Sequence, residues 1–256
     1  MLSYQGFLDK GVHGQVSLYQ NEKKELFAVK SQSISIGVAT EIEILQRLAG
    51  CDCVIPYYGQ VQEGTRVHMV FKFYKWNLLK LCAKPNRDQW AKPVFFQILR
   101  GVAQCHAHGV LHLDLKPSNI MVNDQSCEIR LIDFGLSRIR YDRKMVWTRE
   151  VVTPTYRAPE LLRHESYDEK VDMFSLGVIL ANMFGHVKTF FSSDFDDDDI
   201  QYAYLVKTLW TLPRNYAALV PGFPKEALSL LANLLEFDPQ KRFSAEEAMK
   251  HPWFAS

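Results

Sequence analysis

The most informative stretch of this chain is HLDLKPSN, His112 to Asn119. It places a carboxylate at Asp114, an ammonium group at Lys116 and a carboxamide at Asn119. A carboxylate can accept the proton of a reacting hydroxyl, and carboxylate and amide oxygens are ligands for hard cations such as Mg²⁺. This spacing suits transfer of a phosphoryl group, which needs positioning and charge neutralisation more than a strong base.

Two further motifs follow in order along the chain. Asp133-Phe134-Gly135 begins fourteen residues after Asn119, and Ala158-Pro159-Glu160 comes later. Together the three motifs resemble the catalytic loop, the metal-binding turn and the end of the activation segment of eukaryotic protein kinases. The segment from Val151 to Glu160, with an arginine before Ala-Pro-Glu, is similar to the end of the activation segment in the cyclin-dependent kinase group. The resemblance covers essentially the whole chain.

This resemblance implies an α+β, bilobal fold. A small antiparallel β-rich N-lobe with one key helix would precede a larger, mostly α-helical C-lobe. We expect a single protein kinase catalytic domain over residues 1–256, with the N-lobe at 1–72 and the C-lobe at 73–256.

The periodicity of apolar residues indicates the same division of the chain. Alternation favours strands over residues 3–30 and from Val67 to Phe73, and residues 40–49 have the spacing of a helix. Positions 41, 44, 45 and 48 share one helical face, so Glu41 should point inward. Glu43 lies about 200° further around the helix and should face solvent. After residue 76, helices are expected over residues 89–109, 168–185, 200–210, 225–237 and 245–251.

Composition limits the possible partners and compartment. The 256 residues carry 30 basic and 29 acidic side chains, so no global field would draw the protein to nucleic acid or to an anionic membrane. Five cysteines without C-x-x-C spacing favour a reducing intracellular compartment, cytoplasmic or nuclear. No signal peptide is apparent, and the most apolar run, residues 173–185, is too short to span a bilayer. The acidic run at 194–199 is interpreted as a solvated loop before a helix.

The same resemblance locates a nucleotide site for ATP. The segment LDKGVHGQV is similar to a kinase glycine-rich loop, in which Asp9 occupies the place of the first glycine. That carboxylate would repel a phosphate by about 1 kcal/mol at about 4 Å in water, which predicts weaker binding of nucleotide. Lys30 resembles the lysine that contacts the α- and β-phosphates and pairs with Glu41. The residues of the loop are Leu8, Asp9, Lys10, Gly11, Val12, His13, Gly14, Gln15 and Val16. Adenine would lie among Leu8, Val16, Ala28 and Met121, with Phe71 behind it and the backbone of Lys72 and Tyr74 at its edge.

By the same resemblance, each polar residue of the catalytic motifs has one role. Asp114 would orient the acceptor hydroxyl and Lys116 would steady the γ-phosphate. Asn119 and Asp133 would ligate Mg²⁺. Lys116 and Thr153 are typical of the serine/threonine branch, so the expected substrates are proteins with Ser or Thr acceptors.

Regulation and activity leave alternatives open. Thr148 falls where cyclin-dependent kinases carry an activating phosphothreonine, but Leu113 replaces an arginine that would bind it. The sequence of the helix that contacts cyclin in that group is not reproduced, so a cyclin-like activating subunit and a role in the cell cycle or in transcription remain hypotheses. The competing class is a pseudokinase that binds nucleotide or acts as a scaffold, which Asp9 and Leu113 favour. A small-molecule kinase is disfavoured, because the complete segment from 153 to 160 serves peptide substrates in the family.

Overall fold

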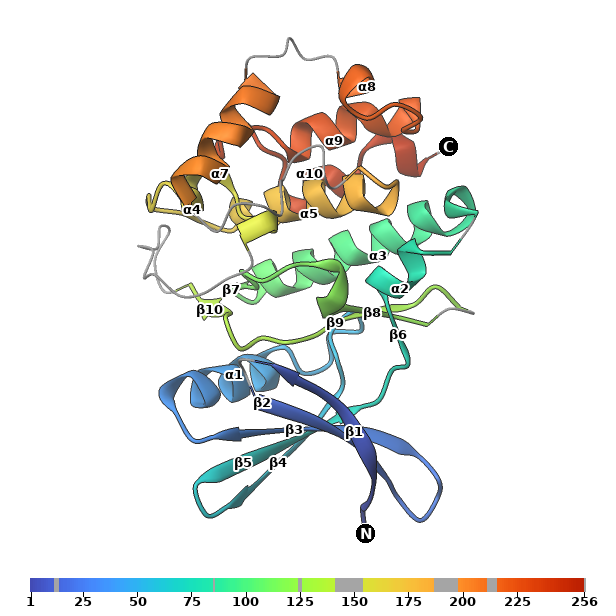
Figure 1. The fold of residues 1–256 in the computed structure, drawn as a ribbon, viewed down its shortest axis with the longest axis vertical. Helices are drawn as coiled ribbons and strands as arrows, with labels where there is room; N and C mark the ends of the chain where they lie inside the picture. The colour runs from blue at the N-terminus through green and yellow to red at the C-terminus, as the bar shows by residue number, and fades with distance from the viewer. Residues whose placement is uncertain are drawn as a thin grey trace.

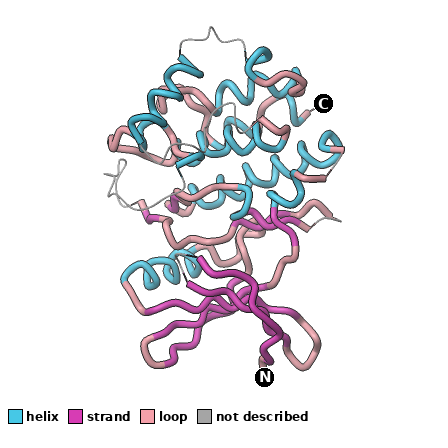
Figure 2. The backbone as a smooth tube through the Cα atoms, in the orientation of Figure 1, coloured by secondary structure: helices cyan, strands magenta, loops and turns pink. Residues whose placement is uncertain are grey.

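The protein has two lobes stacked along its long axis, as Figure 1 shows for the computed structural model. The structure describes residues 1–256 except 12–13, 85, 124–125, 141–153, 187–197, 211–215 and 256. The N-terminal lobe is mainly β-sheet and carries one helix, and the C-terminal lobe is mainly helical (Figure 2). This arrangement confirms the predicted α+β, bilobal fold.

The N-terminal lobe is a five-stranded antiparallel sheet in the order β1-β2-β3-β5-β4. The strands are β1 (Ser3–Gly11), β2 (Gly14–Gln20), β3 (Leu26–Ser33), β4 (Tyr57–Glu63) and β5 (Arg66–Lys72). In the register, Lys30 of β3 lies between Val16 of β2 and Met69 of β5. Lys30 is therefore held in the middle of the sheet.

Helix α1 (Ile36–Arg47) packs beside this sheet. It begins four residues earlier than the pattern predicts, because the Ser35 hydroxyl accepts a hydrogen bond from the Val38 backbone N at 3.3 Å and so caps the first turn. Positions 41, 44, 45 and 48 are buried, and Glu43 is exposed. The predicted inward face of this helix is thus confirmed.

The chain enters the second lobe through residues 73–75 and the short strand β6 (Trp76–Asn77). Two small sheets, β6-β8-β9 and β7-β10, lie next to the first lobe and carry the loops with the sequence motifs (Figure 1). Their remaining strands are β7 (Val110–Leu111), β8 (Ile120–Val122), β9 (Ile129–Leu131) and β10 (Arg138–Ile139). The α-helices of this lobe are α2 (Leu78–Cys82), α3 (Arg87–Ala107), α4 (Pro159–Leu162), α5 (Lys170–Met183), α7 (Asp198–Leu205), α8 (Tyr216–Leu219), α9 (Leu228–Leu234) and α10 (Ala245–Met249). The shorter turns are the 3₁₀-helices η1 (Pro117–Asn119), η2 (Pro154–Tyr156), η4 (Lys225–Ala227) and η5 (Pro252–Phe254), and the π-helical turn η3 (Val206–Trp210).

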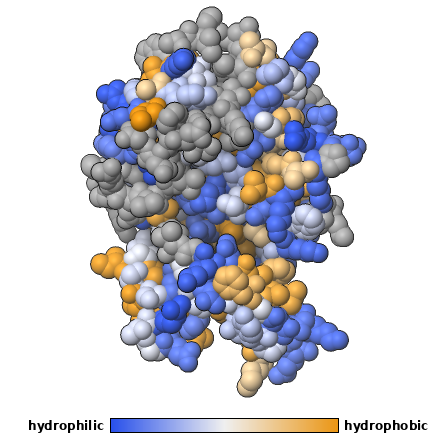
Figure 3. All heavy atoms as spheres, in the orientation of Figure 1, coloured by the Kyte–Doolittle hydropathy of each residue, from blue (hydrophilic) through white to orange (hydrophobic). Residues whose placement is uncertain are grey.

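Helix α5 forms the centre of the helical lobe, with α3 and α9 packed against it. Twelve of its fourteen residues are buried, so it is apolar almost all round. Gly177 lets α9 approach closely, because a Cβ there would lie 2.7 Å from Leu235 Cδ2. In the space-filling view, hydrophobic residues gather in patches on the β-rich lobe, and others show on the helical lobe among hydrophilic residues (Figure 3). Among the described helices, none is both long and apolar enough to span a membrane.

The expected helix at 225–237 is divided. It begins as the 3₁₀ turn η4, continues as α9 and ends at Leu234. Pro239 disfavours helical backbone at the residue before it, and the Glu236 carboxylate accepts hydrogen bonds from the backbone N of Phe237 and Asp238 instead. Similarly, the helix expected at 200–210 is α7 followed by the π-helical turn η3.

Candidate active site

A cleft of about 880 Å³ lies between the two lobes. Its walls come from β1, β2, β3 and β5, from the connection to α2, and from the loops around β8 and β9. The residues predicted from sequence that line it are Leu8, Asp9, Gly14, Val16, Ala28, Lys30, Glu41, Phe71, Lys72, Tyr74, Asp114, Lys116, Asn119, Met121 and Asp133. Residues from distant parts of the sequence therefore converge on one concave site of a size suited to a small ligand.

The remaining residues of the glycine-rich loop do not line this cleft as far as the structure describes them. Lys10, Gly11 and Gln15 lie on the β1–β2 hairpin beside it, where Gly11 pairs with Gly14. Val12, His13, Thr148 and Thr153 fall outside the described residues. The Asp9 carboxylate lies at the cleft and accepts a hydrogen bond from the Lys10 backbone N at 2.7 Å.

Gly14 is required by the geometry of this hairpin. Its φ is +113°, in the left-handed region that favours glycine. A Cβ at this position would lie 2.6 Å from the Ser31 carbonyl oxygen on β3. The hairpin can therefore lie this close to β3 only if this residue has no side chain.

Lys30 contacts two carboxylates at the back of the cleft. Its Nζ donates to Glu41 Oε1 at 2.7 Å and to Asp133 Oδ1 at 2.8 Å. Burial would lower the pKa of Lys30, but the charges and hydrogen bonds of Asp133 and Glu41 outweigh it and raise the pKa above its usual value. Lys30 is thus a fixed cation that joins β3, α1 and the Asp133 turn.

The loop that follows β7 carries three polar groups in one hydrogen-bonded cluster. Asp114 Oδ2 accepts from Lys116 Nζ at 2.8 Å and from Asn119 Nδ2 at 2.9 Å. Asn119 Nδ2 also donates to the Asp114 carbonyl at 2.9 Å. Within the part of the chain that the structure describes, no group donates to Asp114 Oδ1. The carboxylate is therefore oriented through one oxygen, and the other can accept a proton or a hydrogen bond.

Asn119 and Asp133 are brought together by the β8–β9 ladder. Ile120 pairs with Leu131, and the Ile132 backbone N donates to the Asn119 carbonyl at 3.0 Å. Both Nδ2 bonds of Asn119 point toward Asp114, and its Oδ1 accepts from no described residue. An amide oxygen and a carboxylate fit Mg²⁺, which prefers oxygen ligands and retains phosphate and water oxygens for the others. Asn119 and Asp133 would supply two such protein ligands. Among the described residues, no group of three or more His, Cys, Asp or Glu is placed so that it could hold a metal ion.

Asp172 of α5 fixes the backbone of the loop from beneath. Its Oδ2 accepts from His112 N at 2.9 Å and its Oδ1 from Leu113 N at 2.9 Å. These bonds support Leu113 at φ +65°, an unfavourable conformation for a leucine. Complete burial would raise the pKa of Asp172, but the hydrogen bond from His106, the imidazole charges and the backbone bond hold its pKa below the usual value.

His106 contributes to this support and was not predicted to do so. His106 is in the last turn of α3, and its Nε2 lies 2.9 Å from Asp172 Oδ2. His112 lies against the Phe134 ring, with a centroid separation of 4.9 Å, and its Nε2 is 3.1 Å from the Ile132 carbonyl oxygen. No local pattern would reveal the His106 contact, because its partner is 66 residues away.

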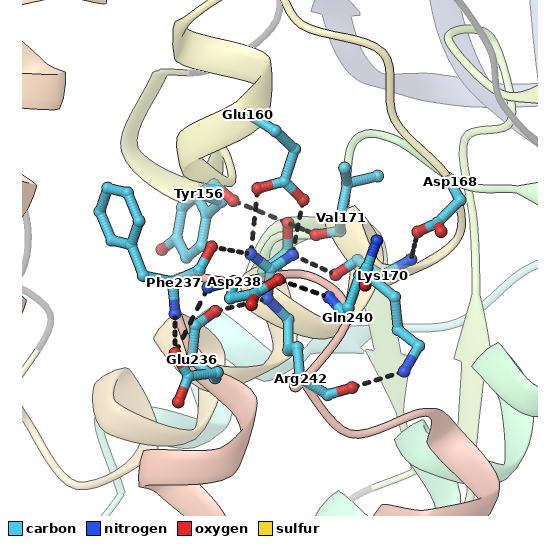
Figure 4. A network of polar contacts seen from close by, with 11 residues as sticks. Tyr156, Glu160, Asp168, Lys170, Val171, Glu236, Phe237, Asp238, Gln240 and Arg242 are labelled. Carbon is cyan, nitrogen blue, oxygen red and sulfur yellow. Dashed lines mark hydrogen bonds and ion pairs between the residues drawn. The ribbon is translucent and has the colours of Figure 1, made fainter.

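A second buried ion pair joins the Ala-Pro-Glu motif to the end of the chain. Arg242 donates from Nη1 and Nη2 to the two oxygens of Glu160, at 2.6 and 3.0 Å (Figure 4). It also donates to the carbonyls of Glu236, Lys170 and Phe237. Arg242 is 1% exposed, so this bidentate pair anchors α4 deep in the helical lobe.

One residue of the acidic run at 194–199 forms a largely buried ion pair within the helical lobe. Asp198, at the start of α7, accepts from Arg157 Nη1 at 2.6 Å, and both side chains are largely buried. The expectation of a solvated loop therefore does not hold for Asp198, because Arg157 is brought against it by the fold. Residues 194–197 lie outside the described residues.

A cleft between a β-rich and a helical lobe, lined by a lysine paired with a carboxylate, by two further aspartates and by an amide, is the arrangement typical of protein kinases. The family model "Protein kinase domain" matches residues 3–254. The chain belongs to the protein kinase domain family. Membership of this family supports transfer of a phosphoryl group from ATP to protein substrates.

Proposed function

We propose that this chain is an active serine/threonine protein kinase that uses MgATP, and that residues 1–256 form a single catalytic domain with lobes at 1–72 and 73–256. The observation that carries the proposal is the convergence of Lys30, Glu41, Asp114, Asn119 and Asp133 on one cleft. These residues come from four separate segments of the sequence. Each retains a side chain able to perform its proposed role.

The chemistry follows from the geometry of these groups. Lys30, fixed by Glu41, would bind the α- and β-phosphates, and the glycine hairpin would cover them. Asn119 and Asp133 would hold Mg²⁺, which neutralises phosphate charge when bound. Asp114, oriented through Oδ2, would accept the proton of the acceptor hydroxyl at Oδ1, while Lys116 steadies the transferred phosphoryl group.

The preference for Ser and Thr rests on Lys116, two residues after Asp114, and on Thr153. The Lys116 ammonium lies at the cleft beside Asp114, where it can reach the transferred group. Grouping with the cyclin-dependent kinases, a cell-cycle or transcription role and a cyclin-like subunit are narrower hypotheses that rest on sequence resemblance. Asp9 and Leu113 keep a pseudokinase as the second candidate, since they alter nucleotide binding and regulation.

A transfer assay distinguishes these candidates. Purified protein is incubated with labelled ATP, Mg²⁺ and peptides that carry a Ser, Thr or Tyr acceptor, beside the variants Lys30→Met and Asp114→Asn. We expect label on Ser and Thr peptides, little on Tyr peptides, and loss of transfer in both variants. Binding of ATP without transfer to any peptide would favour the pseudokinase, and equal labelling of Tyr peptides would contradict the proposed specificity.

A further inference from the structure

Glu41 has a second hydrogen-bond donor that lies outside the sequence motifs. Gln32 is two residues after Lys30 on β3, so both side chains point to the same face of the sheet. Gln32 Nε2 donates to Glu41 Oε2 at 3.0 Å, while Lys30 Nζ donates to Glu41 Oε1 at 2.7 Å. Each oxygen of this carboxylate, in a residue that is 2% exposed, thus has its own donor from the same strand.

We propose that Gln32 is a positioning residue that holds Glu41 in the orientation in which it pairs with Lys30. An ionised carboxylate can only accept hydrogen bonds, so the amide nitrogen of Gln32 must face it. Two donors at fixed separation on one strand set both the position and the rotation of the carboxylate. The inference rests on the proposed kinase function, because it assigns Gln32 to the placement of the phosphate-binding lysine.

The surrounding backbone limits the movement of both side chains. Only Ile34 and Ser35 connect β3 to α1, and the Ile34 backbone N donates to the Thr65 carbonyl at 3.0 Å. A Cβ added at Gly14 would lie 3.0 Å from Gln32 Cβ, so the backbone of the glycine hairpin is packed directly against this residue. The short connection leaves α1 little freedom to swing away from the sheet.

The consequence concerns regulation of the site. With Gln32 and Lys30 both bound to Glu41, the Lys30–Glu41 contact is assembled by the chain itself. No activating subunit pressing on α1 is needed to form it. Removing the Gln32 amide would leave Glu41 Oε2 buried without a donor, and α1 could then relieve this by rotating the carboxylate toward water.

The test compares Gln32→Leu with Gln46→Leu, an exposed glutamine on α1 whose side chain makes no described hydrogen bond. We expect Gln32→Leu to lower kcat/KM for ATP roughly tenfold, the effect of leaving one buried charged oxygen unpaired, with a rise in KM. Amide hydrogen exchange over residues 36–47 should become faster in Gln32→Leu and stay unchanged in Gln46→Leu. The isolated wild-type chain should be active without any added subunit.

Gln32→Glu supplies a second readout that loss of packing would not produce. Two carboxylates would then face each other, so one of them should have a raised pKa. The other groups near Glu41 are Lys30, Asp133 beyond it, and Tyr57 of β4. Activity of Gln32→Glu relative to wild type should increase as the pH falls, because a protonated carboxyl donates a hydrogen bond as the amide did.

The outcomes separate this proposal from the proposed function. If the wild type transfers no phosphate to any peptide, the kinase function fails, and hydrogen exchange still reports whether Gln32 anchors α1. If the wild type is active but Gln32→Leu matches Gln46→Leu in both kcat/KM and exchange, the role of Gln32 is refuted. If Gln32→Leu does not fold, Gln32→Glu provides the test instead. The role of Gln32 is then refuted if the activity of Gln32→Glu relative to wild type does not change with pH. Activity only in the presence of an added protein would overturn the inference that the site assembles unaided.

Discussion

The buried pair between Arg242 and Glu160 gives a quantitative test of how the helical lobe is held together. Replacing Arg242 by Met keeps much of the apolar volume but removes both hydrogen bonds to Glu160 and three to backbone carbonyls. The remaining carboxylate belongs to a residue that is 5% exposed, so it would be a buried charge without its partner. We expect a loss of about 3–5 kcal/mol in the free energy of unfolding, the usual cost of breaking a buried pair on one side.

Chemical denaturation by urea, followed by tryptophan fluorescence, measures this loss, because Trp90 and Trp253 are buried in the same lobe. The matched control is Lys241→Met, the adjacent residue, whose pair with Asp238 is exposed. That change should alter stability by about 0–1 kcal/mol. The double variant Arg242→Met/Glu160→Leu should be more stable than Arg242→Met alone, since it leaves no unpaired charge. A loss below about 1 kcal/mol in Arg242→Met, or no recovery in the double variant, would refute the reasoning.

Three further outcomes follow from described contacts. Asp172→Asn should be less stable than the wild type near neutral pH. The pKa of Asp172 is lower in the folded than in the unfolded protein, so its carboxylate stabilises the fold above the unfolded pKa. The difference in the free energy of unfolding between the wild type and Asp172→Asn, measured at each pH, should therefore persist down to about pH 5 and shrink below about pH 4. A difference in stability between the wild type and Asp172→Asn that stays the same at every pH would contradict this expectation. Gly177→Ala should lose about 1–3 kcal/mol, because its Cβ would meet Leu235 Cδ2 at 2.7 Å; a melting temperature equal to that of the wild type would exclude such a clash. Gly14→Ala should weaken ATP binding in a calorimetric titration, since its Cβ would lie 2.6 Å from the Ser31 carbonyl oxygen and would displace the hairpin that borders the cleft, whereas unchanged affinity would show that the position of the hairpin does not matter for nucleotide binding.

The inward position of Glu41 could be predicted from sequence because helical periodicity is a local property. Residues 41, 44, 45 and 48 recur at the spacing of one helix face, and all four are buried. The first residue of that helix could not be predicted from the apolar pattern. Ser35 caps it four residues before the apolar pattern becomes clear.

The contacts of Gln32, His106 and Asp198 could not be predicted from local patterns. Each is a polar residue whose significance depends on a partner brought near by the tertiary fold: Glu41 for Gln32, Asp172 for His106 and Arg157 for Asp198. A glutamine on a strand or an aspartate in an acidic run has the same sequence signature whether it faces solvent or a buried charge. The long-range convergence on the cleft was expected only through resemblance to a family, since spacing alone does not specify which segments meet.

The most direct test of the proposed phosphoryl transfer measures kcat and ATP affinity together in Asp114→Asn. Asparagine keeps the size of the side chain and can still accept a hydrogen bond, but it cannot take the proton of the acceptor hydroxyl. We predict that kcat for a Ser or Thr peptide falls by at least about 100-fold. The dissociation constant for MgATP should stay within about threefold of wild type, because Asp114 is proposed to act on the hydroxyl and not on the nucleotide. Transfer by Asp114→Asn at the wild-type rate would contradict the proposed catalytic role.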